Sequence, residues 1–403
     1  MLLAGCFDQP GAGTAKLDAG GAPLKDLGNG VLDAALPLQR IEPTSESELA
    51  ADPTGTTLAY GGIGVWSSTD GGLTWTAAQP FSISGNLDGW TIAFDEAGHL
   101  FAANTEGPNV KVGRSSDGGA SWDAINYVSG VGLGLADRPW IAAHGDGQLA
   151  LMVGDLALQA LGNYERCFTS KDGGATWLDV DVGGSPGPTG GLAFDAAGDF
   201  YGVSQQGVVQ QFGGSCLPSP QTHAAFQAPI NAEELPIATA GTAAYTAATD
   251  AGSGAVVVGG VRGGVAHQVA VSPPQLKTSL YTAVAARGED VAALWYGSST
   301  AGDYQSQGFD GDFDVYVAVV HGFWGNSTIQ VFKVNDTPAH HGGICRNGLS
   351  CTFGRGPGDY FDIEYDAAGA LHAAFASDTV GGATYHVGLS AAFLAAHPGR
   401  LAN

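Results

Sequence analysis

The sequence predicts an all-β protein that forms a single β-propeller of four-stranded blades. Three observations support this fold class. An eight-residue motif occurs three times, a second short motif recurs along most of the chain, and the 403 residues include 64 glycines but only 13% charged residues. This composition suits short, half-buried strands joined by tight turns, and it argues against disorder and long helices.

The eight-residue motif has the form S-x-D-G-G-x-[TS]-W, and each copy lies between strand-like stretches. An aspartate side chain can accept backbone N–H bonds within its own turn, and glycines supply positive φ angles without a steric clash. The tryptophan that follows can anchor the next strand in the core. The motif therefore predicts hairpin turns with structural roles for six residues: Asp70, Trp75, Asp117, Trp122, Asp172 and Trp177.

The second motif is a short apolar strand, a D-x-x-G turn and another strand. Its clearest copies span residues 92–100, 192–200 and 363–371. Counting degenerate copies, the positions equivalent to the aspartate are 52, 95, 144, 195, 240, 286 and 366, although 144 is a histidine and 240 and 286 are alanines. This spacing matches blades of roughly 40–50 residues. We count seven blades within a propeller domain of residues 31–403, with six or eight as alternatives, and residues 30–40 as the outer strand that closes the ring.

The eight-residue motif resembles the Asp-box (BNR) repeat of the sialidase-like β-propeller superfamily. The segment from Trp295 to Asp362 is similar to the C-terminal region of secreted or lipoprotein members in bacteria and archaea, so the resemblance covers roughly residues 42–395. It implies the propeller fold, whereas most such proteins have no assigned substrate.

The N-terminus suggests export. Leu2-Leu3-Ala4-Gly5-Cys6 resembles a bacterial lipobox, in which the cysteine is lipidated, although a chance match in an Ala/Gly-rich chain is the alternative. Residues 1–6 are then the remnant of a lipoprotein signal, and residues 7–30 are a flexible tether. We expect an exported protein of the cell envelope or extracellular space, attached to the membrane only through a lipid on Cys6.

The other four cysteines agree with an exported protein. Cys345 and Cys351 lie six residues apart in a glycine-rich loop, and Cys167 and Cys216 are a second candidate pair. Exported cysteine pairs commonly form disulfides. A zinc site made of His340, His341, Cys345 and Cys351 is the alternative to the first disulfide.

The net charge of −24, with only 15 lysines and arginines, argues against nucleic acid as a partner. We expect a monomer that requires no cofactor. Asp310, Asp312 and Asp314 offer oxygen ligands at alternate positions, so calcium is a candidate ligand there, although the rest of a calcium-binding loop does not follow.

A ligand site is expected where the innermost strands begin, because long irregular loops gather at that mouth of the channel. Carboxylates, aromatic rings and arginines there would suit a sugar, although each of them could instead cap a strand end. The residues expected at this mouth are Glu42, Asp88, Trp90, Asp137, Arg138, Trp140, Glu233, Glu234, Tyr281, Asp359 and Tyr360.

We assign roles within this group and its neighbours. The candidate catalytic residues are Asp359, Tyr360, Asp137 and Glu42, and the candidate substrate-binding residues are Arg138, Trp140, Arg355, Arg40, Trp90 and Tyr281. The resemblance to sialidases would add an arginine triad and a tyrosine nucleophile. Arg40-Ile41-Glu42-Pro43 is close to their R-I-P motif, Arg138, Arg346 and Arg355 are candidates for the triad, and Tyr360 is the candidate nucleophile.

Two functions therefore remain open. One is a cell-envelope protein that binds glycans or acts on them at the channel mouth, as a glycoside hydrolase or a polysaccharide lyase. The alternative is a non-catalytic scaffold whose loops at the mouth of the channel bind a protein partner at the cell surface.

Overall fold

The computed structural model describes residues 24–34, 36–43, 48–78, 81, 90–128, 136–155, 165–181, 190–216, 221–231, 235–346, 351–354, 356–357, 361–379 and 381–401. Cys6 and residues 7–23 of the predicted tether lie outside these ranges. Within them, no helix is long and apolar enough to cross a membrane.

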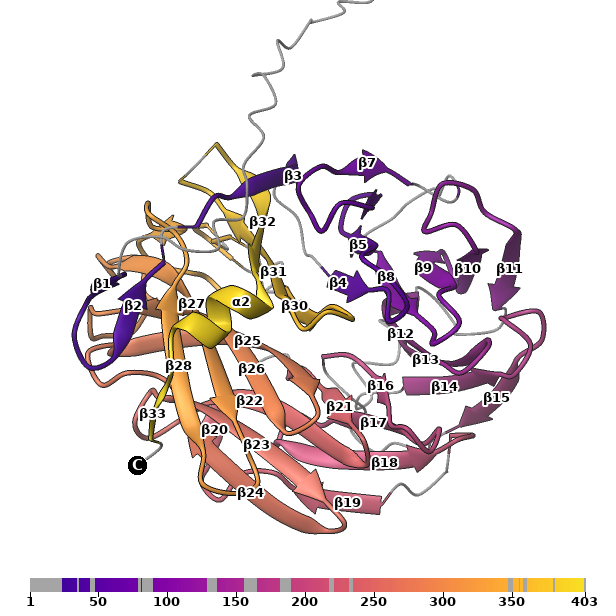
Figure 1. The fold of residues 1–403 in the computed structure, drawn as a ribbon. Helices are drawn as coiled ribbons and strands as arrows, with labels where there is room; N and C mark the ends of the chain where they lie inside the picture. The colour runs from indigo at the N-terminus through magenta and orange to yellow at the C-terminus, as the bar shows by residue number, and fades with distance from the viewer. Residues whose placement is uncertain are drawn as a thin grey trace, which may run out of the picture.

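The described strands form seven sheets, each built on four antiparallel strands (Figure 1). The first four sheets contain β4 (Glu48–Ala51), β5 (Leu58–Gly61), β6 (Val65–Ser68) and β7 (Thr76–Ala77); β8 (Thr91–Phe94), β9 (Leu100–Glu106), β10 (Asn109–Ser115) and β11 (Ala124–Val128); β12 (Ala136–His144), β13 (Gln148–Asp155), β14 (Glu165–Ser170) and β15 (Leu178–Asp181); and β16 (Ala193–Phe194), β17 (Phe200–Val203), β18 (Val208–Gly213) and β19 (Gln221–Ala224).

The remaining three sheets complete the set. They contain β21 (Ala238–Ala240), β22 (Ala243–Asp250), β23 (Val256–Arg262) and β24 (Val265–Ala270), with β20 (Ile230–Asn231) also paired to β22; β25 (Thr278–Arg287), β26 (Asp290–Ser298), β27 (Asp312–His321) and β28 (Thr328–Lys333); and β30 (Asp362–Tyr365), β31 (Leu371–Ser377), β32 (Ala383–Leu389) and β3 (Gln39–Pro43).

The sheets are the blades of a closed ring. Each innermost strand contacts the innermost strand of the next sheet, and β30 of the last sheet contacts β4 of the first. The N-terminal strand β3 pairs with β32 and becomes the outermost strand of the last blade. The prediction of a single β-propeller of four-stranded blades is confirmed. Below, the upper face is where the innermost strands begin, and the lower face is where they end.

The N-terminal region departs from the prediction in one respect. Residues 24–30, which were assigned to the tether, include β1 (Lys25–Asp26), which forms a hairpin with β2 (Val31–Asp33). β2 runs parallel to β28 and extends the sixth blade. The closing strand is therefore residues 39–43 rather than 30–40, because residues 31–33 pair with a different blade.

The C-terminal region also packs on the sixth blade. The helix α2 (Ala391–Ala396) begins at Ser390, whose Oγ accepts a hydrogen bond from the amide of Phe393. β33 (Arg400–Leu401) then pairs with β28, and the short strand β29 (His340–His341) pairs with β27. The largest apolar cluster of the described residues lies in the same region, between the sixth and seventh blades.

The three Asp-Gly-Gly turns share one hydrogen-bond pattern on the lower face. In the first turn, Asp70 Oδ1 accepts from the amide of Thr74 at 2.9 Å, and its Oδ2 accepts from the Thr74 hydroxyl at 2.6 Å. The Ser68 hydroxyl donates to Asp70 Oδ1 and accepts from the amide of Gly72. The same bonds recur around Asp117 and Asp172. These aspartates therefore order their own turns.

The tryptophans of these turns are half-buried rather than fully buried. Trp75 and Trp177 each donate the indole N–H to a carbonyl of their own turn, at 3.1 and 2.9 Å. Trp122 instead donates to the carbonyl of Ala78 in the preceding blade, at 2.9 Å. One indole thus links two blades, while the other two secure their own turns.

Both predicted disulfides are present. Cys167 in β14 is bonded to Cys216, which follows β18, so this bridge links the third and fourth blades. Cys345 is bonded to Cys351, so neither provides a thiolate for the alternative zinc site. Two disulfides favour an oxidising compartment outside the cytoplasm.

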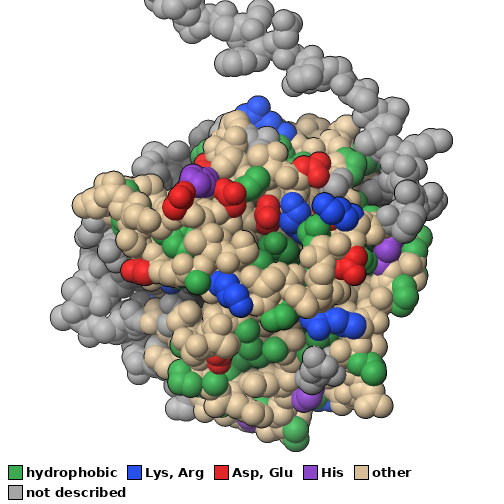
Figure 2. Space-filling view, turned by 90° about the vertical axis from the view of Figure 1, so that its left-hand side faces the viewer, with side chains coloured by type: hydrophobic (Ala, Val, Ile, Leu, Met, Phe, Trp, Pro, Cys, Tyr) green, Lys and Arg blue, Asp and Glu red, His purple; other side chains and the backbone are tan. Residues whose placement is uncertain are grey.

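The surface carries charges of both signs. In the view of Figure 2, lysines and arginines are scattered singly or in small groups among acidic and uncharged side chains. The whole sequence contains 15 basic and 39 acidic residues, so negative charge predominates.

Candidate functional site: the channel carboxyl cluster

The innermost strands are joined by bonds from side chains to backbone amides. Asp362 Oδ2 accepts from the amide of Leu49 at 3.0 Å, and Glu48 Oε2 accepts from the amide of Ile92 at 2.7 Å. In the next blade, Thr91 Oγ1 accepts from the amide of Ile141 at 3.1 Å. In each case the side-chain acceptor of one innermost strand is bonded to a backbone amide of the next innermost strand. The amides belong to Leu49, Ile92 and Ile141, which directly follow Glu48, Thr91 and Trp140 in the sequence.

This regular pattern places four residues at one level of the channel. Asp362, Glu48 and Thr91 occupy equivalent positions in β30, β4 and β8. Trp140 holds the corresponding position in β12, because it precedes Ile141 as Thr91 precedes Ile92. Carboxyl groups and an aromatic residue thus follow one another around the upper half of the channel.

Glu364 adds a third carboxyl group. It lies two residues beyond Asp362 in β30, so the two side chains project from the same face of the strand. Glu48, Asp362 and Glu364 are all half-buried. We call these three residues the channel carboxyl cluster. Glu48 and Asp362 also join strands, whereas no hydrogen bond joins the Glu364 carboxylate to a neighbouring strand in the described part of the chain.

Burial raises the pKa of all three groups. It raises the pKa of Glu48 to about 8, with a further contribution from the charge of Asp362. It raises the pKa of Asp362 to about 7, against the lowering effect of two backbone hydrogen bonds. The pKa of Glu364 lies well above its usual range because of burial and the charges of Asp362 and Glu48. Near neutral pH, the cluster therefore contains protonated carboxyl groups that can donate a proton.

Two backbone bulges lie beside this level. β12 shifts register between Asp137 and Trp140, and β25 shifts register between Leu280 and Ala283. Within these bulges, Arg138 and Tyr281 have φ angles of 49° and 50°, which are uncommon for residues other than glycine. Bulges and such φ angles are concentrated at functional sites, because they redirect side chains.

A series of aromatic contacts connects Tyr281 with the channel carboxyl cluster. The Arg346 guanidinium lies 5.6 Å from the centre of the Tyr281 ring and donates to the Tyr304 hydroxyl at 3.2 Å. Tyr281 packs edge-on against Tyr296, and Tyr296 packs against Phe361 with ring centres 4.9 Å apart. Since Phe361 precedes Asp362, this group borders the cluster on the upper face.

The predicted site residues are only partly brought together. Arg138 is exposed in its bulge, Trp140 is half-buried in β12, and Tyr281 is buried in β25. Trp90 is 2% exposed and packs against Phe81, so it belongs to the core rather than to a ligand surface.

Arg40 and Glu42 lie elsewhere. Both belong to β3, the outermost strand of the last blade, and the Arg40 side chain is exposed there. The expectation that Glu42 leads into an innermost strand is therefore wrong, because the closing strand occupies that part of the chain.

Other predicted positions lie outside the described residues, which include only the backbone of Asp137 and Glu42. Those that are not described at all are Asp88, Glu233, Glu234, Arg355, Asp359 and Tyr360. The sequence reasoning did not assign roles to Glu48, Asp362 or Glu364. The sequence feature that could have identified them is an acidic residue inside a short, otherwise apolar strand. It occurs in Glu48-Leu-Ala-Ala and in Asp362-Ile-Glu-Tyr.

The three aspartates considered for calcium do not converge. Asp310 Oδ1 and Asp312 Oδ1 lie 3.2 and 2.8 Å from the two ring nitrogens of His341. Asp314 instead accepts from the Asn335 side chain at 3.1 Å and lies 3.7 Å from the Lys333 amine. A cation at Asp310 and Asp312 would have to displace His341.

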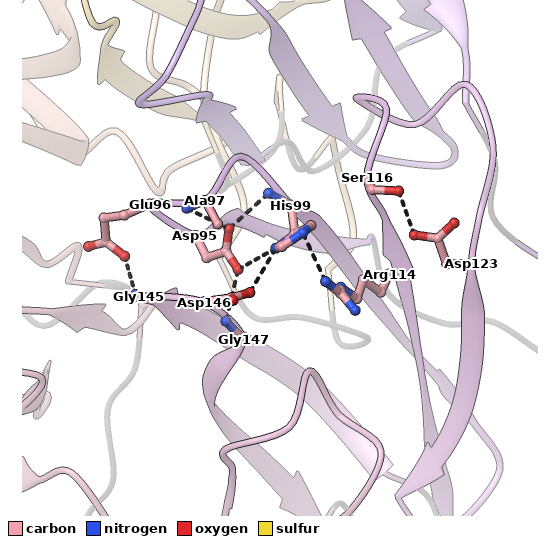
Figure 3. A network of polar contacts seen from close by, with 10 residues as sticks. All are labelled: Asp95, Glu96, Ala97, His99, Arg114, Ser116, Asp123, Gly145, Asp146 and Gly147. Atoms are coloured by element: carbon pink, nitrogen blue, oxygen red, sulfur yellow. Dashed lines mark hydrogen bonds and ion pairs between the residues drawn. The ribbon is translucent and has the colours of Figure 1, made fainter.

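A different group has the closest metal-like spacing among the described residues, namely Asp95, His99 and Asp146 on the lower face (Figure 3). Arg114 donates to His99 Nε2 at 2.8 Å, so His99 Nδ1 carries the proton that it donates to Asp95 Oδ2 at 2.9 Å. Asp95 Oδ2 also accepts from the amide of Gly147 at 2.9 Å. The adjacent guanidinium and the satisfied hydrogen bonds fit a junction between blades better than a cation site.

Comparison with known proteins agrees with the fold. No protein-family model matches the chain, and no curated protein matches it. Among solved structures, "YCF48 bound to D1 peptide" has a TM-score of 0.50 at 14% identity and covers 89% of this chain and 96% of its own.

Two further solved structures are similar. The GH74 enzyme of Niastella koreensis has a TM-score of 0.51 at 14% identity, and the match covers 86% of this chain but 43% of that longer chain. A Hadza microbial sialidase matches at a TM-score of 0.41 and 14% identity, over 87% of this chain and 66% of its own. At these identities the likeness concerns the fold alone. The chain has a β-propeller fold, as predicted.

Proposed function

We propose that the protein is a carbohydrate-active propeller of the cell envelope that binds a glycan at the upper mouth of its channel and hydrolyses a glycosidic bond there. The observation that carries the proposal is the channel carboxyl cluster, in which burial raises the pKa of Glu48 to about 8 and that of Asp362 to about 7. Glycoside hydrolysis commonly uses one protonated and one ionised carboxyl group.

The neighbouring residues suit a sugar ligand. Trp140 lies at the level of the cluster and offers an aromatic surface, and Arg138 projects from a bulge in the same strand. Aromatic faces pack on sugar rings, and an arginine can bind the carboxylate of an acidic sugar. We assign proton donation to the glycosidic oxygen to Glu364, because its carboxyl group is not used to join strands. Asp362, when ionised, would stabilise the positive charge that develops on the sugar.

The decisive experiment is a hydrolase and lyase screen on a panel of polysaccharides and aryl glycosides, combined with a glycan array. On a substrate that is turned over, Glu364→Gln should lower kcat by at least about a hundredfold while the melting temperature is retained. Asp117→Asn, in a turn on the lower face, is the matched control and should leave kcat unchanged. Equal kcat for Glu364→Gln and the native protein would remove Glu364 from the mechanism.

A scaffold function is the second candidate. One of the similar solved structures is a propeller with a bound peptide, and the two share the fold over most of both chains. If no glycan binds and no substrate is cleaved, while a peptide library yields a ligand whose binding is lost in Arg138→Gln, the scaffold function replaces the hydrolase.

The proposed location includes a lipid on Cys6, a monomeric propeller and export. Two disulfides are consistent with export. Mass spectrometry of the natively expressed protein should detect a diacylglyceryl adduct on Cys6, and light scattering should give a mass near 40.7 kDa without the lipid.

A further inference from the structure

Thr91 forms hydrogen bonds in two directions beside the channel carboxyl cluster. Its Oγ1 accepts from the amide of Ile141 in β12 at 3.1 Å, and its hydroxyl is hydrogen-bonded to the carboxyl group of Glu48 in β4. It therefore connects three successive innermost strands, β4, β8 and β12, which lie next to one another around the ring (Figure 1). Thr91 is 3% exposed, so bulk water does not compete for these bonds.

The partners of the Thr91 hydroxyl determine its direction. A backbone N–H can only donate, so the amide of Ile141 uses a lone pair of Oγ1. The single hydrogen of the hydroxyl is then available for Glu48, and a donated hydrogen bond favours the ionised form of a carboxyl group. Glu48 Oε2 also accepts from the amide of Ile92 at 2.7 Å, so β8 supplies two donors to this carboxyl group.

The other two carboxyl groups of the cluster have different donors. Asp362 Oδ2 accepts from the amide of Leu49 at 3.0 Å, and its Oδ1 accepts from the amide of Ile363 at 2.8 Å. Among the described residues, the carboxyl group of Glu364 accepts only from the amide of the next residue, Tyr365. Because each donor stabilises the ionised form, Glu364 has the least stabilisation of this kind and should keep its proton longest.

The charges that act on Glu48 come from one strand. Asp362 and Glu364 both belong to β30, and burial raises the pKa of Glu48 with a further contribution from the charge of Asp362. The other strands that contact β4 bring no further carboxylate: β8 has no titratable side chain, and β5 places Gly61 opposite Glu48. In β31 the titratable side chain is that of His372, whose two ring nitrogens have other partners.

We propose that Thr91 is a positioning residue of this site, which orients the carboxyl group of Glu48 and makes it release its proton before Glu364. The inference rests on the function proposed above, in which Glu364 donates a proton to the glycosidic oxygen. Thr91 acts through Glu48. Once Glu48 is ionised, its negative charge holds the remaining proton on Glu364.

The test titrates the carboxyl groups directly and needs no substrate. The full chain is labelled with carbon-13 at the side-chain carboxyl groups of Asp and Glu, and NMR spectra are recorded from about pH 5 to about pH 10. The variants Glu48→Gln and Glu364→Gln assign the two glutamate signals, because each removes one of them.

Thr91→Val keeps the shape of the side chain and removes the hydroxyl. The pKa of Glu48 should rise by at least about half a pH unit, because its ionised form loses a donor. The pKa of Glu364 should fall, because Glu48 then stays neutral to higher pH and repels the Glu364 carboxylate less. On a substrate that is turned over, the alkaline limb of the pH profile of kcat should move to lower pH, because this limb follows the loss of the Glu364 proton.

Two variants serve as matched controls. Thr91→Ser keeps the hydroxyl and should titrate as the native protein does. Thr239 in β21 likewise uses its hydroxyl to join two innermost strands, but it donates to a carbonyl, that of Phe194 in β16. Thr239→Val removes a bond between blades without touching the cluster, so it should leave the titration of all three carboxyl groups unchanged.

A purely structural role for Thr91 predicts a different result. If the hydroxyl only joins strands, its loss admits water, and the pKa values of all three carboxyl groups fall towards their ordinary range. A falling or unchanged pKa of Glu48 in Thr91→Val would therefore overturn the proposal, as would an equal shift in Thr91→Ser. If no glycan is cleaved but the titration shifts as expected, the proposed hydrolase fails while the role of Thr91 towards Glu48 stands.

Discussion

A Cβ atom on Gly72 would lie 2.0 Å from Cε1 of His386, although the two residues belong to opposite ends of the propeller domain. Gly72 lies in the turn between β6 and β7 of the first blade, and His386 lies in β32 of the last. The positive φ of Gly72, 86°, also favours glycine. The turn of the first blade is therefore fitted directly against the blade that closes the ring.

The equivalent glycines of the other two Asp-Gly-Gly turns allow a graded test of this fit. Gly119 and Gly174 have similar φ angles of 92° and 85°, but an added Cβ would lie 2.9 Å from Ala78 Cβ and 3.4 Å from Leu149 Cδ1, respectively. We expect Gly72→Ala to destabilise most, Gly119→Ala less and Gly174→Ala least, with about 1 kcal/mol common to all from the backbone. The free energy of unfolding is measured in urea. Equal losses in all three variants would show that the close approach of Gly72 to His386 does not affect stability.

Acid should weaken the closure through His386. Burial first, and then the neighbouring His372, lowers the pKa of His386 to about 3, so it stays neutral while the unfolded chain takes up a proton near pH 6.5. Stability should therefore fall as the pH drops from about 6.5 towards about 3, by up to about 1.4 kcal/mol per pH unit from this group.

The measurement is the free energy of unfolding at several pH values between 7 and 4. His386→Gln should flatten the profile, whereas His223→Gln, in the outermost strand β19 of the fourth blade, should leave it as steep as before. Parallel profiles for His386→Gln and the native protein would contradict the assignment.

Alkaline pH should weaken the fold through the channel carboxyl cluster. Because the pKa of Glu48 rises from 4.5 to about 8 on folding, the folded protein keeps a proton that the unfolded chain has lost. Stability then falls as the pH rises from about 4.5 through about 8. Glu48→Gln should reduce this fall, by up to about 1.4 kcal/mol per pH unit between about pH 4.5 and 8, and the exposed Glu289→Gln should not. Chemical unfolding at pH 5, 7 and 9 provides the comparison, and an unchanged slope in Glu48→Gln would refute it.

The bridge between the third and fourth blades should contribute strongly to stability. Cys167 and Cys216 close a loop with a sequence separation of 49. Replacing both by serine should cost about 2–4 kcal/mol, chiefly because the unfolded chain gains freedom. A double substitution of Cys345 and Cys351, separated by 6 residues, should cost less. Thermal unfolding of both variants decides the order, and a larger loss for the shorter loop would contradict it.

The sequence was sufficient where structure depends on neighbours in the chain. Asp70, Asp117 and Asp172 order turns of a few residues. Both partners of each hydrogen bond lie within the motif, so the motif alone predicts the turn. The repeat spacing likewise predicted a ring of four-stranded blades. The prediction that placed Arg40 and Glu42 at the channel mouth was wrong, because both belong to β3. This strand pairs with β32 from the other end of the domain, and no local sequence pattern reveals such a pairing.

The site was harder to predict for the same reason. Glu48 and Asp362 are more than 300 residues apart, and only the closed ring makes Asp362 the acceptor for the amide of Leu49. Each strand on its own shows an acidic residue in a short apolar segment, which could equally be a solvated strand end. The raised pKa of these carboxyl groups arises from burial that the whole propeller creates.

The closing strand β3 also constrains how this protein can be made. Its partner β32 is synthesised more than 300 residues later, so β3 must wait, unpaired, until β32 has left the ribosome. During that interval β3 has no partner strand, and an unpaired strand is prone to pair with other chains. A chain that stops before β32 cannot form the ring, so premature products should be recognisable to proteases and chaperones as unfinished. Ring closure thereby acts as a checkpoint on synthesis through β32.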